Sequence, residues 1–218
     1  MKQKLILIVV LCAILVGFNQ DELPNVLIIG DSISLGYTPF VKSALNDKAN
    51  VVHNKGNAQH TGTGLEKLVE WLGDTQWDVI HFNWGLWDLC YRHPDSKIQG
   101  NRDKINGTVT FTPEQYRDNM EALVLRLQKT GAKLIFATTS YVPKDEAGRI
   151  ANSNKVYNKE ALAVMKKYGV TINPLSGVSK KVHKKHAAGS GDVHYTKEGY
   201  RLLSISVVEQ IENCLEAI

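Results

Sequence analysis

The sequence of 218 residues contains only three cysteines, and its excess of positive charge is only +4. So few cysteines exclude a disulfide-rich scaffold. The lysines and arginines are scattered along the chain, which argues against a nucleic-acid-binding protein. The composition, 43% hydrophobic and 22% charged, is that of a globular protein, and the length fits one domain.

Sequence patterns for metals and phosphates are also missing. His81, Asp88 and His93 do not form a metal-ligand pattern, and Gly62-x-Gly64 is too short to indicate a phosphate-binding loop. The sequence therefore predicts no metal and no cofactor. The densest basic cluster, residues 180–186, is interpreted first as the solvated face of a helix, with attraction of an acidic polymer as the alternative.

Long hydrophobic runs are absent except at the N-terminus, where Lys2 and Lys4 precede the uncharged apolar residues 5–18. This pattern is typical of a secretory signal peptide and is too short for a confident membrane span. We therefore expect residues 1–19 to be a signal peptide, residues 22–218 to be the folded domain, and the protein to be periplasmic or extracellular. Because residues 16–20 lack a small-x-small cleavage pattern, an uncleaved tether remains an alternative.

Two cysteines, Cys90 and Cys214, follow the predicted signal peptide. An exported protein can pair them, but two free thiols fit the sequence equally well.

Strand and helix patterns alternate along the rest of the chain. This alternation predicts a single three-layer α/β/α domain with a five-stranded parallel sheet, flavodoxin-like in its layering. The expected strands are residues 25–29, 49–53, 77–82, 132–138 and 170–173, and the expected helices are residues 35–45, 65–72, 113–129, 152–168 and 196–218.

Polar residues follow the first three strands, at Gly30-Asp31-Ser32, Asn54-Lys55-Gly56 and Asn83-Trp84-Gly85, and a fourth polar group, Asp192-Val193-His194, precedes the last helix. The carboxyl ends of parallel strands meet at one edge of the sheet, so these groups can converge there. Serine needs a base such as histidine to become nucleophilic, and the histidine needs an acid that orients it. Ser32, His194 and Asp192 can supply these three roles. The alternative for Asp31 and Ser32 is that they only cap the helix that follows.

These motifs resemble the blocks of the SGNH hydrolases, also called GDSL-type esterases and lipases. Gly30-Asp31-Ser32-Ile33 resembles the nucleophile block, and Asp192 and His194, followed by Thr196-Lys197-Glu198-Gly199, resemble the last block. The resemblance implies a flavodoxin-like serine hydrolase whose oxyanion hole uses the backbone N–H groups of Ser32 and Gly56.

The chain departs from the family pattern at two points. Trp87 stands where the third block, Gly-x-Asn-Asp, has its asparagine, so Asn83 is our candidate for the third oxyanion donor. The alternative is that the Asn83 side chain only satisfies local backbone groups. The acid Asp192 lies two residues before His194, where the usual spacing is three. The alternative is a Ser–His dyad in which a backbone carbonyl orients His194.

A long polar segment, residues 91–112, follows the third strand, and segments of this length are often functional. The aromatic residues Trp84, Trp87 and Tyr91 cluster just past the third strand and suggest a platform for a sugar ring, with Arg92 placed to bind its hydroxyl groups. The alternative is that these aromatic side chains only pack in the core. We therefore predict a secreted serine esterase that acts on O-acetyl groups of a carbohydrate. The alternatives are a short-chain lipid or thioester hydrolase and a catalytically silent carbohydrate-binding protein.

Overall fold

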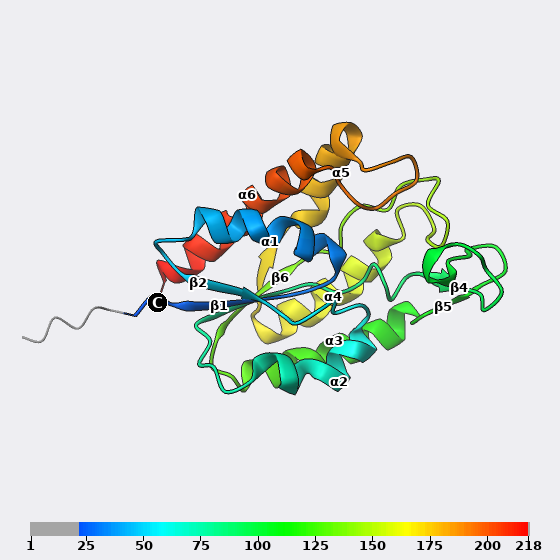
Figure 1. The fold of residues 1–218 in the computed structure, drawn as a ribbon. Coiled ribbons are helices and arrows are strands. Elements are labelled where there is room, and N and C mark those ends of the chain that lie inside the picture. The colour runs from blue at the N-terminus through cyan, green and yellow to red at the C-terminus, as the bar shows by residue number, and fades with distance from the viewer. Residues whose placement is uncertain (1–21, 218) are drawn as a thin grey trace, which may run out of the picture.

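A parallel sheet of five strands forms the centre of the molecule in a computed structural model that describes residues 22–217 (Figure 1). The predicted signal peptide lies outside the described residues. From one edge to the other, the sheet consists of β2 (Asn50–His53), β1 (Asn25–Ile29), β3 (Val79–Phe82), β6 (Lys133–Ala137) and β7 (Thr171–Asn173).

Helices cover both faces of this sheet (Figure 1). One layer contains α1 (Ser32–Ala44), α5 (Leu175–His186) and α6 (Lys197–Leu215), in which α6 packs against both others. The opposite layer contains α2 (Thr61–Leu72), α3 (Pro113–Gln128) and α4 (Asn154–Tyr168), in which α3 lies in the middle. The predicted three-layer α/β/α domain with five parallel strands is confirmed, and its strand order is the flavodoxin-like one.

The central strands form because they are almost entirely apolar. Every residue of β3 is buried, as are the last four residues of β1 and of β6. A parallel strand that is covered on both faces needs this near-continuous apolar character. The edge strand β2 is only partly buried, and its residues alternate in exposure.

The polar segment 91–112 contains more regular structure than its sequence suggests. It holds an antiparallel pair, β4 (Tyr91–Arg92) and β5 (Thr108–Val109), and a short helix, η1 (Gln99–Asn101). Backbone hydrogen bonds join the segment to residues 144–149: the Tyr91 N–H donates to Gly148 O at 2.6 Å and the Lys104 N–H to Ala147 O at 2.9 Å. The two segments together form one wall above the sheet edge.

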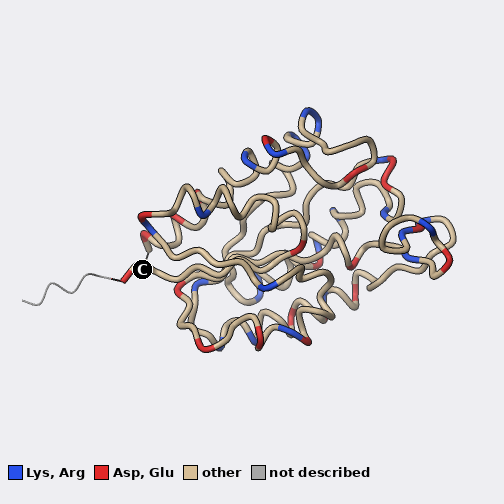
Figure 2. Tube along the Cα trace, in the orientation of Figure 1, with Lys and Arg blue, Asp and Glu red and all other residues tan. Residues whose placement is uncertain are grey.

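Charged residues are spread over the described surface without one dominant patch (Figure 2). The basic cluster lies on α5, where its four lysines are exposed, as the helix-face interpretation predicted. No helix within residues 22–217 is both long enough and apolar enough to cross a membrane. Cys90 and Cys214 are both free thiols, so the structure favours the second of the two alternatives left open for them.

Candidate active site

The nucleophile candidate Ser32 is the first residue of α1, directly after the buried strand β1. Asp31 is the N-cap of this helix, and its Oδ1 accepts a hydrogen bond from the Ile33 N–H at 2.9 Å. The cap is therefore provided by Asp31, which leaves the Ser32 hydroxyl free. Capping and a nucleophilic serine are thus compatible, because two neighbouring residues supply them.

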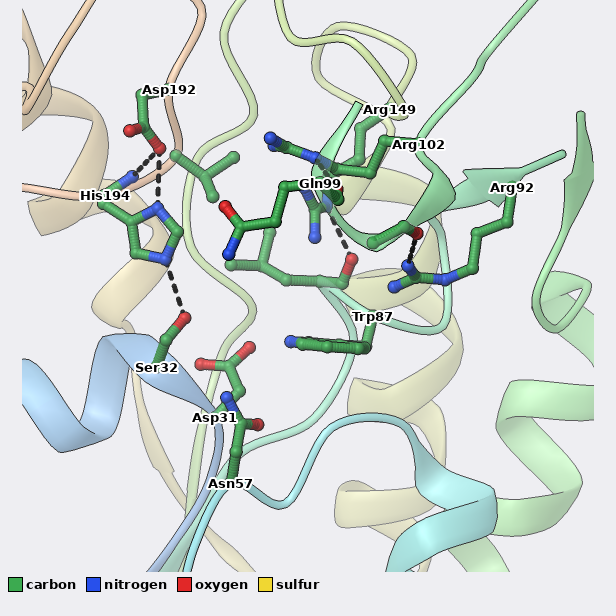
Figure 3. Close-up of a pocket in the computed structure, with 13 residues that line it drawn as sticks. Asp31, Ser32, Asn57, Trp87, Arg92, Gln99, Arg102, Arg149, Asp192 and His194 are labelled. Atoms are coloured by element: carbon green, nitrogen blue, oxygen red, sulfur yellow. Dashed lines mark hydrogen bonds and ion pairs between the residues drawn. The ribbon is translucent and has the colours of Figure 1, made fainter. Parts of the chain in front are cut away.

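Ser32, His194 and Asp192 lie in hydrogen-bond contact (Figure 3). The Ser32 Oγ is 2.8 Å from His194 Nε2, and His194 Nδ1 is 2.6 Å from Asp192 Oδ1. The backbone N–H of His194 also donates to Asp192 Oδ1, at 2.9 Å. The shorter spacing of the acid thus lets Asp192 contact the imidazole and the backbone of the same histidine.

The two carboxyl groups near Ser32 have different electrostatic surroundings. Partial burial works to raise the pKa of Asp192, but hydrogen bonds from the backbone N–H and the ring of His194 outweigh it and lower the pKa. Asp31 is fully buried, and burial raises its pKa, while its Oδ2 has no hydrogen-bond partner within the described chain. Asp192 is therefore the acid that can stabilise a charged imidazole.

The loop that carries Asp192 is fixed by α5. His183 Nε2 lies 2.6 Å from the backbone carbonyl of Asp192 and donates to it, and an isolated bridge pairs Ala187 with Tyr195. His183 was not expected to have this role, because a histidine among exposed lysines shows no pattern that separates it from its neighbours.

Two backbone N–H groups are available for an oxyanion. Gly56 adopts a left-handed turn, with φ of 74°. Asn54 holds this turn beside β1: its Oδ1 accepts from the Gly30 N–H at 2.9 Å and its Nδ2 donates to Gly56 O at 3.2 Å. Neither the Ser32 N–H nor the Gly56 N–H has a backbone or side-chain acceptor within residues 22–217.

The side chain of Asn83, our sequence candidate for the third donor, is directed away from Ser32. Its Nδ2 donates to the Ala137 carbonyl at 2.6 Å, in the interior of the sheet, and Asn83 does not line the pocket. Asn57 lines the pocket instead, together with Ser32 and Asp31 (Figure 3). Its Oδ1 accepts from the Gln59 N–H at 2.8 Å, whereas its Nδ2 has no acceptor in the described chain.

A pocket of about 440 Å³ opens above Ser32 and His194. Trp87 and Arg92 line it, and the Arg92 guanidinium carbon lies 4.6 Å from the centre of the Trp87 ring. The other two predicted substrate contacts are absent from it. Trp84 is fully buried and its Nε1 donates to Ala58 O at 3.2 Å, so the sugar-platform interpretation is wrong for this residue. Tyr91 belongs to the wall and does not line the pocket.

A second pocket of about 530 Å³ adjoins the first and shares Trp87, Arg92 and Gly100 with it. His60 and His93 lie in this second pocket. The stacked Trp87 and Arg92 therefore stand between two adjoining hollows.

Two further arginines, Arg102 and Arg149, line the first pocket. Both donate from Nη1 to Oε1 of the fully buried Glu146, each at 2.8 Å. Sequence reasoning missed Arg149 and Glu146, because they lie in an irregular segment without a motif.

A strand-end serine in contact with a histidine–aspartate pair defines the arrangement of a nucleophilic hydrolase. Residues 28–202 match the model of the GDSL-like lipase/acylhydrolase family, and the chain belongs to this family. The comparison with curated proteins found no match.

Similar solved structures support the fold. A lipase/acylhydrolase from Enterococcus faecalis is 19% identical, with a TM-score of 0.69 over 88% of this chain and 96% of that one. Axe2, an acetylxylan esterase from Geobacillus stearothermophilus, is 18% identical, with a TM-score of 0.68 over 86% of this chain and 94% of that one. A putative GDSL-like lipase from Parabacteroides merdae is 16% identical, with a TM-score of 0.66 over 85% and 94%.

Proposed function

We propose that this chain is a serine esterase that hydrolyses O-acetyl groups on a carbohydrate through an acyl-enzyme. The observation that carries the proposal is the contact of Ser32 Oγ with His194 Nε2, at 2.8 Å, while Asp192 holds the other ring nitrogen at 2.6 Å. The position of Ser32 at the carboxyl end of a central strand supports the same reading, because ligands of such sheets bind there.

The reaction begins when Ser32 Oγ attacks the acyl carbon and His194 Nε2 takes its proton. Asp192 stabilises the imidazolium that forms. The tetrahedral intermediate then collapses, and the C–O bond to the alcohol breaks as the imidazolium returns the proton to the leaving oxygen. Water, activated by the same imidazole, attacks the acyl-Ser32 and releases acetate.

The oxyanion of each intermediate is stabilised by the N–H groups of Ser32 and Gly56 and, in this proposal, by the Nδ2 of Asn57. These are groups at the sheet edge without acceptors in the described chain. One such donor contributes about 3 kcal/mol to lowering the barrier. Asn57 thereby replaces the third-block asparagine, whose position Trp87 occupies.

The proposed substrate class rests on the shape and chemistry of the pocket. Trp87, which lines both pockets beside the stacked Arg92, offers aromatic surface to a sugar ring, and the two adjoining pockets extend the site along the polar segment 91–112. Two proteins with the same fold, AlAXEase and Axe2, are acetyl xylan esterases. We also propose that the protein is exported, because residues 5–18 form an uncharged apolar run after Lys2 and Lys4.

Release of acetate from a panel of acetylated oligosaccharides, compared with hydrolysis of octanoyl and thioester substrates, tests this function. Ser32→Ala is the control for background hydrolysis. Faster release from the acetylated sugars supports the proposal, whereas preference for the octanoyl or thioester substrates assigns the alternative hydrolase activity. If no ester is cleaved while Ser32→Ala and the unmodified chain bind the sugars equally, the protein is a carbohydrate-binding member of the family.

A further inference from the structure

The pocket above Ser32 is lined by three arginines. Arg92 comes from β4, Arg102 follows η1, and Arg149 lies in the segment between β6 and α4. In Figure 3 they stand together on the side opposite the pair of Asp192 and His194, with Trp87 below them. Three cations on one wall of a small pocket require a chemical explanation, because like charges that are held close together repel one another.

Among residues 22–217, Glu146 is the only carboxylate that forms an ion pair with any of the three. Glu146 is fully buried and accepts from Nη1 of both Arg102 and Arg149, while its Oε2 accepts from the Gly148 N–H at 2.6 Å. The single negative charge of Glu146 balances one of the two positive charges of Arg102 and Arg149 and leaves the other uncompensated.

Arg92 has no carboxylate partner in the described chain. Its Nη1 donates to the Gly100 carbonyl, and its guanidinium stacks on the Trp87 ring. A stacked guanidinium is held in place while its edge stays free to form hydrogen bonds. Arg92 therefore adds a second uncompensated positive charge to this side of the pocket.

Asp31 and Asp192 also line the pocket, and within the described residues neither forms an ion pair with the three arginines. Asp192 is hydrogen-bonded to His194, whose positive charge during catalysis it must balance. Asp31 is fully buried, its Oδ2 has no hydrogen-bond partner in the described chain, and burial raises its pKa although the charge of Arg149 works in the opposite direction.

Free donors remain on the arginines. Within residues 22–217, the Nη2 atoms of Arg92, Arg102 and Arg149 have no hydrogen-bond acceptor. Arg149 is the most informative of them, because it is 95% buried, lines the pocket and is held by Leu86 O through its Nε at 2.6 Å. A buried, positioned guanidinium with a free donor indicates a partner that carries an acceptor.

We propose that the ester substrate carries a carboxylate, and that Arg92, Arg102 and Arg149 bind it while Ser32 attacks the acetyl group. The substrate class is then an acetylated carbohydrate that contains a uronic acid. This inference rests on the proposed esterase function. Guanidinium groups bind carboxylates through paired, charge-assisted hydrogen bonds, which are stronger than those to neutral oxygens.

The test compares two substrates that differ only in charge: an acetylated methyl glucuronoside and the same compound with its carboxylate blocked as a methyl ester. Acetate release is measured for both at low and high salt. We expect kcat/KM to be at least about tenfold higher for the free acid, and the ratio to fall as salt screens the charges. Arg92→Gln should lower the ratio several-fold, and Arg92→Lys should lower it less. The matched control is Arg117→Gln on α3, which removes an exposed arginine paired with Asp118 and should leave the ratio unchanged.

Equal kcat/KM for the free acid and its methyl ester would overturn the carboxylate proposal while leaving the esterase function intact. An unchanged ratio in both Arg92→Gln and Arg102→Gln, with folded proteins by circular dichroism, would also overturn it. Failure to release acetate from either compound or from neutral acetylated sugars contradicts the esterase function itself.

Discussion

Asp31 and Ser32 show how the properties of single residues determine the site. The side chain of Asp31 caps α1, which frees the Ser32 hydroxyl to contact His194 Nε2 at 2.8 Å. Two asparagines differ in the same way: Asn83 makes a structural hydrogen bond to a sheet carbonyl, whereas Asn57 lines the pocket with an Nδ2 that has no acceptor in the described chain.

Asp192→Asn should lower kcat by roughly 10²–10⁴-fold with little change in KM, because an amide neither stabilises the imidazolium nor favours the correct tautomer. Steady-state kinetics on an acetyl ester measure this. Asp47→Asn, an exposed change after α1, is the matched control and should retain full activity. A near-normal rate in Asp192→Asn would instead support a dyad in which a backbone carbonyl orients His194.

Asn57→Ala should lower kcat by roughly 10²–10³-fold while KM stays within a few-fold, because its amide is expected to contact the oxyanion of the intermediate more strongly than the ground-state carbonyl. Asn46→Ala, at an exposed position after the end of α1 opposite to Ser32, controls for the loss of an amide. Equal losses in Asn57→Ala and Asn46→Ala, or a change confined to KM, would contradict the assignment.

At the scale of helices and strands, the buried carboxyl group of Asp88 links the turn after β3 to α2. Asp88, which follows β3, accepts from the Thr61 N–H at 2.9 Å and from the Thr61 Oγ1 at 2.5 Å, at the start of α2. Thr61 Oγ1 in turn accepts from Asn119 Nδ2 of α3 at 2.9 Å. Asp88 is fully buried, and burial raises its pKa to about 7. Asp88 thus attaches the turn that carries Trp87 to α2, and Thr61 extends the link to α3.

Asp88 should make the fold less stable as the pH rises from about 4 to about 7. Over this interval the carboxyl ionises in the unfolded chain, where its pKa is about 3.9, but stays protonated in the folded protein, so unfolding becomes more favourable. The loss amounts to about 4 kcal/mol and is complete above pH 7. Asp88→Asn removes this loss of stability. Urea unfolding at pH 4.5 and 8 should therefore show that the free energy of unfolding of the variant, relative to that of the unmodified protein, is higher at pH 8 than at pH 4.5. Parallel pH profiles for the two proteins would contradict the raised pKa.

The fold and the residues in local motifs could be predicted from the sequence. The five strands follow from apolar runs, and Ser32, Asp192 and His194 follow from short motifs at strand and helix ends. The direction of a side chain after a strand could not be predicted. The chain turns at Gly85, whose φ is 137°, and a Cβ there would approach Thr139 Oγ1 to 2.2 Å. Before this turn Trp84 packs into the core, and after it Trp87 lines the pocket. The cluster of Arg92, Arg102 and Arg149 could not be predicted either, because the three residues come from separate segments that meet only in the folded chain.

On the scale of the whole molecule, the two thiols lie at opposite ends of the domain. Cys90 directly precedes β4, and Cys214 lies near the end of α6, next to the C-terminus (Figure 1). The described domain is therefore held together by its core of packed strands and helices, without a disulfide between these residues.

The melting temperature should consequently be the same with and without a reducing agent. Differential scanning fluorimetry measures it, and alkylation of the unfolded, unreduced protein followed by peptide mass analysis should modify both Cys90 and Cys214. A melting temperature that falls on reduction, together with an unmodified pair, would show that the two residues are linked.

The central claim is that Ser32 is a nucleophile activated by His194, and reaction with a fluorophosphonate tests it most directly. An activated serine attacks the phosphorus and displaces fluoride, so the intact mass should rise by one phosphonyl group, and peptide analysis should place it on Ser32. Ser32→Ala should show no adduct under the same conditions. No adduct on the unmodified protein, or an equal adduct on Ser32→Ala, would contradict the account.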